Sequence, residues 1–212
     1  MYLSRLILNP RSRRTQQELA APYEMHRTIM SAFPEDLADG ERVLFRVDVD
    51  RHTGVPTVLV QSQRPANWSL LKVESDYLLH AKSLGQPNPA QKQFEPSFAA
   101  GQRLAFRMRA NPSFKRDGQR LAWLREEDQH AWLDRKAEDS GFHVLSLLVI
   151  PEGMVTPEKH SAEASHRMSV YSVRFDGLLM VTDSERFRDT LAAGIGPAKA
   201  FGFGLLSVAP VH

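Results

Sequence analysis

Two side chains near the start of the chain, Tyr23 and His26, have the types and the spacing that proton-transfer chemistry needs. Side chains three residues apart on a helix are neighbours, so the two can address one ligand together. Imidazole has an unperturbed pKa of about 6.5, so it accepts and donates protons near neutral pH. A lone histidine on the shoulder of a helix is more often a packing or surface residue, so the pair is a candidate site only.

The helix predicted over residues 22–33 must position this pair. Its first residue is a proline, whose missing N–H costs nothing in the first turn, and a second proline follows its end. Met25, Ile29 and Phe33 recur every four residues and form the stripe that such a helix buries. At about 100° per residue, His26 falls roughly 60° from the centre of that stripe, at the edge of the buried face.

The stretch from Gly194 to Pro210 is the second candidate for ligand binding. It holds four glycines and one cation: Gly194, Gly196, Gly202, Gly204 and Lys199. Glycine at this density lets the backbone approach a ligand closely, and backbone N–H groups can then form an anion-binding nest. The stretch matches neither a Walker loop nor a dinucleotide fingerprint. A glycine that ends a helix, followed by a sharp turn into a strand, accounts for the composition equally well.

Positive charge is concentrated in two segments, although the formal net charge of the chain is only +2. Residues 1–27 carry five arginines against two glutamates, and residues 103–125 carry seven cations against one aspartate. Within the second segment, Arg103, Arg107 and Arg109 fall on one side of a predicted strand. Such segregation favours a polyanion as the partner, with a solvated charged face as the alternative.

The sequence lacks the residues that several classes of active site require. The chain has no cysteine, which excludes disulfides and thiolate sites and fits a reducing compartment. The histidines and carboxylates show no metal-ligand spacing. The apolar runs are far too short to cross a bilayer, and the first residues do not form a signal peptide. Metal-free cleavage of RNA needs less, because the 2′-hydroxyl of the substrate is the nucleophile, and a His, a Tyr and one or two cations suffice.

The order of the predicted elements is approximately strand–helix–strand–strand–helix–strand in each half of the chain. This is the ferredoxin-like βαββαβ pattern twice, an α+β fold with helices on one face of each sheet. The pattern predicts strands over residues 2–8, 41–50, 55–62, 102–109, 142–150 (buried) and 205–208. It also predicts a polar loop at residues 11–14, a linker over residues 87–96 and a hairpin with a type I′ turn at Asp176-Gly177.

Five segments, in order along nearly the whole chain, carry a resemblance to a known family. They are PYEMHRT (22–28), RMRANP (107–112), AWLDRK (131–136), FDGLLMVTD (175–183) and GIGPAKAFGFGLLSVAP (194–210). Together they resemble the CasE family, the CRISPR-associated precursor-RNA endoribonucleases of type I-E systems. The resemblance implies two tandem ferredoxin-like domains with an RNA-binding cleft. Residues 1–90 would form the N-terminal domain with the catalytic histidine, and residues 97–212 the C-terminal domain.

The resemblance also implies an activity and its residues. It implies cleavage of CRISPR repeat RNA hairpins without metal or cofactor, by the 2′-hydroxyl of the RNA. His26 would be the acid or base and Tyr23 its partner. Ser31 stands where some relatives have a lysine that could steady the phosphate, and Arg27 is the candidate to replace it. The residues expected to bind RNA are Arg27, Arg103, Arg107, Arg109, Lys159, His160, Arg167, Gly194, Gly196, Lys199, Gly202 and Gly204. The residues from 156 to 167 match the basic hairpin that enters the RNA major groove in the family.

The expected partners are a CRISPR repeat RNA hairpin and the other subunits of the Cascade complex, with no membrane, and the expected location is the cytoplasm. A non-catalytic RNA-binding scaffold subunit with the same fold is the alternative, and the absence of a lysine at Ser31 favours it. A ferredoxin-like regulator that binds small molecules is a third class, and it predicts no salt-dependent affinity for RNA.

Overall fold

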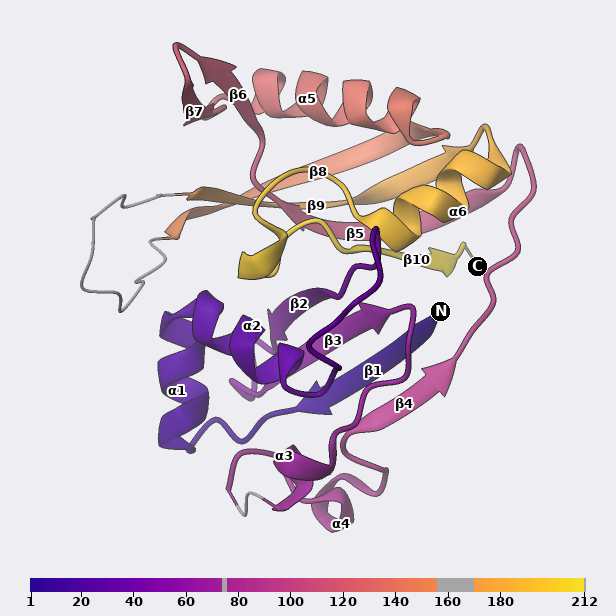
Figure 1. Ribbon diagram of the computed structural model, residues 1–212. Coiled ribbons are helices and arrows are strands. Elements are labelled where there is room, and N and C mark those ends of the chain that lie inside the picture. Colours follow the sequence, from indigo (N-terminus) through magenta and orange to yellow (C-terminus); the bar gives the residue numbers. More distant parts are fainter. Residues whose placement is uncertain (74–75, 156–169, 212) are drawn as a thin grey trace. The chain divides into compact units, whose positions relative to one another are not determined.

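The computed structural model describes residues 1–73, 76–155 and 170–211. The chain divides into two compact units, drawn in Figure 1. Unit 1 consists of Met1–Glu95 with Ala200–Gly202, and unit 2 consists of Pro96–Lys199 with Phe203–His212. A short piece of the glycine-rich stretch therefore belongs to the first unit although it lies near the end of the chain.

Unit 1 is built on a four-stranded antiparallel sheet of order β2-β3-β1-β4. Its elements are β1 (Tyr2–Ile7), α1 (Arg13–Ala20), α2 (Pro22–Met30), β2 (Leu44–Val49), β3 (Pro56–Ser62), α3 (Ser69–Val73), α4 (Ala81–Leu84) and β4 (Ala90–Gln93). This strand order, with the first and third strands in the centre, is that of the predicted βαββαβ fold.

The predicted apolar stripe holds α2 on this sheet. Met25 and Ile29 are each only 1% exposed, and Phe33 lies in the same core just beyond the end of the helix. They pack with strand residues such as Leu6 of β1 and Val60 of β3. The stripe predicted from the sequence is thus confirmed, and burial of each large apolar side chain stabilises the fold by roughly 1.5–3 kcal/mol.

Unit 2 repeats the architecture with a sheet of order β10-β5-β9-β8. Its elements are β5 (Arg103–Ala110), β6 (Ser113–Arg116), β7 (Gln119–Ala122), α5 (Glu126–Asp139), β8 (Phe142–Val155), β9 (Val170–Val181), α6 (Ser184–Ala193) and β10 (Leu206–Pro210), and the 3₁₀ turn η1 (Lys199–Phe201) joins the two units. Figure 1 shows α5 and α6 on the same face of the sheet. The fold class is therefore α+β, with two tandem ferredoxin-like domains.

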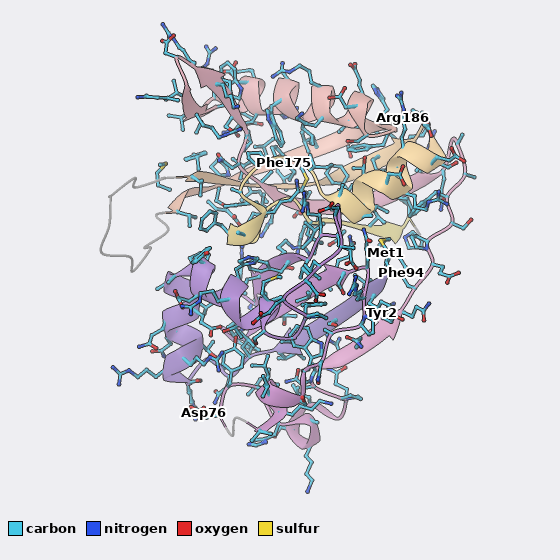
Figure 2. The ribbon with its side chains drawn as sticks, viewed as in Figure 1. Met1, Tyr2, Asp76, Phe94, Phe175 and Arg186 are labelled. Atoms are coloured by element: carbon cyan, nitrogen blue, oxygen red, sulfur yellow. The ribbon has the colours of Figure 1, made fainter. Side chains whose placement is uncertain are left out.

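Aromatic contacts fill the core of unit 2 between its helices and its sheet. Trp132 of α5 stacks on Phe175 of β9 with ring centroids 6.2 Å apart, and Phe187 of α6 meets Phe142 of β8 edge-on at 5.7 Å. Figure 2 labels Phe175 in this layer. The Asp183 side chain accepts hydrogen bonds from the backbone N–H groups of residues 185 and 186, so it caps α6.

The polar loop predicted at residues 11–14 is wrong, because Arg13–Ala20 forms α1. The face that α1 buries is polar: Thr15 is 0% and Glu18 is 5% exposed. A search for apolar periodicity does not detect a helix that is held by hydrogen bonds.

The linker predicted over residues 87–96 contains the boundary between the two units, which falls between Glu95 and Pro96, but most of it is not a linker, since it contains β4. This strand pairs with β1 in the register Tyr2↔Gln93, and the N–H of Phe94 donates to the carbonyl of Met1 over 2.9 Å. Figure 2 shows Met1, Tyr2 and Phe94 together at this end of the sheet. An edge strand can be polar, so the sequence AQKQ carried no apolar alternation that would have revealed it.

Two predictions about β8 and β9 need correction. The strand predicted as buried, β8, is an edge strand, with Leu145 and Leu148 42% and 59% exposed. The predicted type I′ turn at Asp176-Gly177 does not form, because both residues lie inside the continuous strand β9. The chain forms such a turn at another Asp-Gly pair, Asp117-Gly118, where φ is 50° and 77° between β6 and β7.

Gly177 is required by a close approach of backbones and not by a turn. The register between β8 and β9 shifts between Val144 and Ser146, a β-bulge that pushes the chain toward Gly177. A Cβ atom at Gly177 would collide with the carbonyl oxygen of Ser146 and would lie 3.0 Å from the ring of Phe106. Only glycine fits between the bulge and the core.

We expect Gly177→Ala to destabilise the protein by about 1–3 kcal/mol, the usual cost of overpacking against atoms that cannot yield. The measurement is the free energy of unfolding in urea. Gly118→Ala is the control, because Gly118 has a φ of +77° but nothing within 4 Å of its Cβ position. It reports the cost of left-handed backbone alone. A Gly177→Ala protein as stable as the native one would contradict the bulge argument.

Candidate active site on helix α2

His26 lies on α2 in contact with two aromatic rings. Its imidazole stacks on Phe45 of β2, with centroids 6.2 Å apart and planes inclined by 17°, and the centroid of the Tyr23 ring lies 5.9 Å from that of His26. The side chain is half-buried, at the edge of the apolar stripe as predicted. Packing between aromatic rings fixes the direction of the imidazole without a hydrogen bond.

The protonation of His26 is set by this burial. Its Nδ1 atom is buried and has no hydrogen-bond partner within residues 1–73, 76–155 and 170–211. Desolvation lowers the pKa of His26 below its ordinary value of 6.5, because burial disfavours the charged ring. At neutral pH the ring is therefore mainly neutral, with a nitrogen lone pair ready to accept a proton.

A buried hydrogen-bond network fixes α2 on the polar side, and sequence reasoning missed it. Glu18 of α1 accepts hydrogen bonds from Thr28 Oγ1 of α2 at 2.6 Å and from the Tyr77 hydroxyl at 2.5 Å. The guanidinium of Arg14 donates to both Glu18 (2.8 Å) and Thr28 (2.7 Å) and lies 4.7 Å from the centroid of the Tyr77 ring. Helix α1 and the segment around Tyr77 are thereby tied to the turn of α2 that carries His26.

Arg27 and Ser31, near His26 on α2, both have partners within the helix. Arg27 is exposed and forms an i,i+3 ion pair with Glu24 at 3.1 Å. Such a surface pair is worth little, so a phosphate can replace Glu24 at low cost. Ser31 donates from Oγ to the carbonyl of Thr28 at 2.8 Å, at the C-terminal end of α2. Ser31 supplies no charge.

The glycine-rich stretch contributes aromatic packing to this site. Phe201 lies 6.0 Å from the ring of Tyr23. Gly202 has a φ of +82°, and a Cβ atom there would lie 3.1 Å from the ring of Phe45, the ring on which His26 stacks. Both residues belong to unit 1. The rings of Phe45 and Phe201 complete the site and were not predicted, although Phe201 stands beside the predicted Gly202.

The remaining glycines of the stretch have local structural roles. Gly194 follows α6 at its C-cap with a φ of 73°, as predicted. Gly196 lies against the ring of Trp132, and a Cβ atom at Gly204 would meet the carbonyl of Ile195 at 2.6 Å. Lys199 begins the turn η1. These contacts account for the three glycines without a ligand.

Two of the three arginines predicted on one side of β5 are already paired. Arg107 forms two hydrogen bonds to Asp176 (2.7 and 2.9 Å), and Arg109 forms two to Glu152 (2.6 and 2.8 Å). Arg103 is exposed at the start of the strand. The predicted alternation of β5 is confirmed, but the charges of Arg107 and Arg109 are compensated within unit 2.

The structure leaves one part of the prediction aside. Lys159, His160 and Arg167 lie outside the described residues. Among the residues that are described, no group of three or more His, Asp or Glu side chains could hold a metal ion. No helix in the described ranges is long and apolar enough to cross a membrane.

Comparison with known proteins gives the family. A family model described as "CRISPR associated protein" matches residues 1–210. The CRISPR-associated endoribonuclease Cse3 of Thermus thermophilus is 39% identical over 221 residues, with 99% of this chain and all of that protein covered. The CRISPR system Cascade subunit CasE of Escherichia coli is 29% identical over the full length of both chains.

A solved structure supports the same relationship. Thermus thermophilus Cse3, bound to an RNA that represents a pre-cleavage complex, superposes with a TM-score of 0.84 at 37% identity, with 99% of this chain and 98% of that chain covered. Sequence and fold agree over both ferredoxin-like units. The chain belongs to the CasE (Cse3) family of CRISPR-associated proteins.

Proposed function

We propose that this protein is an endoribonuclease that cleaves CRISPR repeat RNA hairpins without a metal ion and stays bound to its product as a subunit of a Cascade complex in the cytoplasm. The observation that carries the proposal is a half-buried, mainly neutral His26 packed against the rings of Tyr23 and Phe45 in a member of this family. Relatives named as an endoribonuclease and as a Cascade subunit support the substrate and the assembly.

The neutral imidazole suits the role of general base. His26 takes the proton of the 2′-hydroxyl, the 2′-oxygen attacks the adjacent phosphorus, and the bond from phosphorus to the 5′-oxygen breaks. The products are a 2′,3′-cyclic phosphate and a 5′-hydroxyl, which takes a proton from an acid. Tyr23, within 5.9 Å of His26 between ring centroids, either supplies that proton or orients the 2′-hydroxyl.

The proposed RNA contacts divide between the two predicted domains, residues 1–90 and 97–212. Arg27, at the active site, steadies the phosphate once RNA displaces Glu24. Arg103 is the strongest candidate on β5, while Arg107 and Arg109 are held by carboxylates and contribute less. The glycine-rich stretch with Lys199, and Lys159, His160 and Arg167, remain proposed contacts on the strength of the family resemblance alone.

We expect His26→Ala to slow cleavage of the cognate repeat hairpin by about 10²–10⁴-fold, the usual weight of general acid–base catalysis. Affinity for the hairpin should stay within about twofold of native, because the imidazole is not a phosphate-binding cation at neutral pH. A denaturing gel and a filter-binding titration measure the two quantities. A His26→Ala protein that cleaves the hairpin at the native rate would rule out His26 as the catalytic acid or base.

Metal independence and the nucleophile are tested together. The native protein should cut the repeat hairpin equally well in EDTA, and it should spare a hairpin whose cleavage-site 2′-hydroxyl is replaced by hydrogen. Loss of cleavage in EDTA would show that a metal takes part. A non-catalytic scaffold, the alternative, would bind both hairpins and cut neither.

The lowered pKa of His26 predicts a pH profile. A base must be neutral, so kcat/KM should fall as pH drops through the pKa of His26, with the midpoint of this acid limb below 6.5, and should level off toward neutral pH. The His26→Ala protein should lack this limb. A limb centred above 6.5, or one that His26→Ala retains, would refute the assignment of His26 as the base.

A further inference from the structure

The hairpin formed by β6 and β7 is a small element that the proposed site does not use. Ser113–Arg116 and Gln119–Ala122 form a two-stranded sheet of their own, closed by the two-residue turn Asp117-Gly118. In Figure 1 the hairpin stands beside the start of α5, apart from the four-stranded sheet of unit 2. It was not predicted as an element, although the sequence analysis marked its cations.

The hairpin carries positive charge without compensation. Lys115, Arg116 and Arg120 are exposed, and Asp117 is the hairpin's one acidic residue. The Arg116–Asp117 pair is long, at 3.7 Å, and the side chains are 73% and 93% exposed. A pair of that kind contributes almost nothing to stability and hardly screens the cations.

The strand register places two of these cations opposite each other. Lys115 pairs with Arg120, so the two side chains share one face of the hairpin. The Arg120 guanidinium donates to the hydroxyl of Ser113 at 3.1 Å, a neutral partner on the same face. Like charges directly opposite across two strands destabilise a hairpin, by an amount comparable to the roughly 0.2–1 kcal/mol that opposite charges gain.

Elsewhere in unit 2, the arginines of β5 are paired with carboxylates. On β5, Arg107 meets Asp176 of the adjacent strand β9, and Arg109 meets Glu152 of β8, each through two hydrogen bonds. In contrast to these arginines, the cations of the β6–β7 hairpin are not neutralised by carboxylates of neighbouring elements that the structure describes. A local arrangement that costs stability without any gain in the core is expected at functional sites.

The hairpin is nevertheless well supported at its base. The rings of Phe114 and Trp123 lie 4.2 Å apart, and the backbone N–H of Trp123 donates to the carbonyl of Pro112 at 2.9 Å. The side chain of Gln129, which is fully buried, donates to the carbonyl of Trp123 at 2.9 Å. The cations are thus presented on a fixed arm, which reduces the entropy lost when they bind a ligand.

We propose that the β6–β7 hairpin is a second RNA-binding element, in which Lys115 and Arg120 together hold backbone phosphates away from the cleavage site. The inference rests on the proposed function for its choice of RNA as the polyanion. Two like charges on one face match successive phosphates of a strand, and phosphate contacts position RNA without reading its sequence. The element therefore contributes affinity and not chemistry.

The test replaces both cations with neutral side chains of similar length, K115Q/R120Q. Affinity for the cognate repeat RNA should fall roughly tenfold at low salt, and the slope of log affinity against log salt should become shallower by about 1.4–1.8, as expected for two lost phosphate contacts. The cleavage rate at saturating protein should stay native. The melting temperature of the free protein should be unchanged or higher, because a like-charge pair is removed, whereas a merely structural role would lower it.

The matched control is R135Q/R188Q, which removes two positive charges from exposed positions of α5 and α6. It should keep the native salt slope. Native affinity and slope in K115Q/R120Q, or an equal loss in the control, would overturn the proposal. His26→Ala separates the two ideas: if it cleaves normally, the proposed active site fails while the salt slope still tests the hairpin. The affinities of K115Q/R120Q and the native protein are also compared on a repeat hairpin with and without its 5′ single-stranded extension. If the β6–β7 hairpin binds that extension, the difference in affinity disappears when the extension is removed, and if it binds the stem, the difference remains.

Discussion

The attachment of α2 to its sheet is the constraint on which the proposed activity depends. On one side, Met25 and Ile29 bury an apolar stripe, and on the other, Glu18 binds Thr28 and Tyr77 in a fully hydrogen-bonded buried network. These contacts fix the rotation of the helix about its axis. His26 lies on the flank of the apolar stripe away from Thr28, roughly 160° from it at 100° per residue. It is therefore presented in one orientation, and catalytic geometry of this kind tolerates little displacement.

Burial has a second consequence at the same position. The rings of Phe45 and Tyr23 that orient the imidazole also remove water from it, which lowers its pKa. Positioning and protonation therefore have one cause. The glycine-rich stretch fits this account through Gly202, whose lack of a side chain lets the chain lie against Phe45, and through Phe201 beside Tyr23.

The sequence predicted the elements that follow apolar periodicity. The two βαββαβ units, the buried stripe of α2 and the alternation of β5 were all confirmed. It did not predict elements whose buried faces are polar or whose strands lie at an edge: α1 is held by Thr15 and Glu18, and β4 is the polar segment AQKQ. The Asp-Gly dipeptide occurs at residues 39–40, 117–118 and 176–177, and the dipeptide alone does not show which copy closes a hairpin; the third copy lies inside β9, where Gly177 faces the bulge of β8.

The candidate site likewise contains residues that the sequence predicted and residues that it did not. Tyr23 and His26 followed from residue type and spacing, because i,i+3 neighbours on a helix must lie together. Phe45 and Phe201 did not, because their approach depends on tertiary packing between segments far apart in sequence. The ion pairs of Arg107 and Arg109 were also not predicted, for the same reason. Because these pairs neutralise the charges on β5, the excess positive charge of residues 103–125 is concentrated at the β6–β7 hairpin.

The most direct test of the central claim is an NMR titration of the His26 ring in the free protein, set beside the pH dependence of kcat/KM, which reports the ionisation of the free enzyme. The account predicts that the ring titrates below 6.5 and that its pKa coincides with the midpoint of the acid limb. A His26 that titrates at or above 6.5, or whose pKa differs from that midpoint, would contradict the claim that this imidazole accepts the proton.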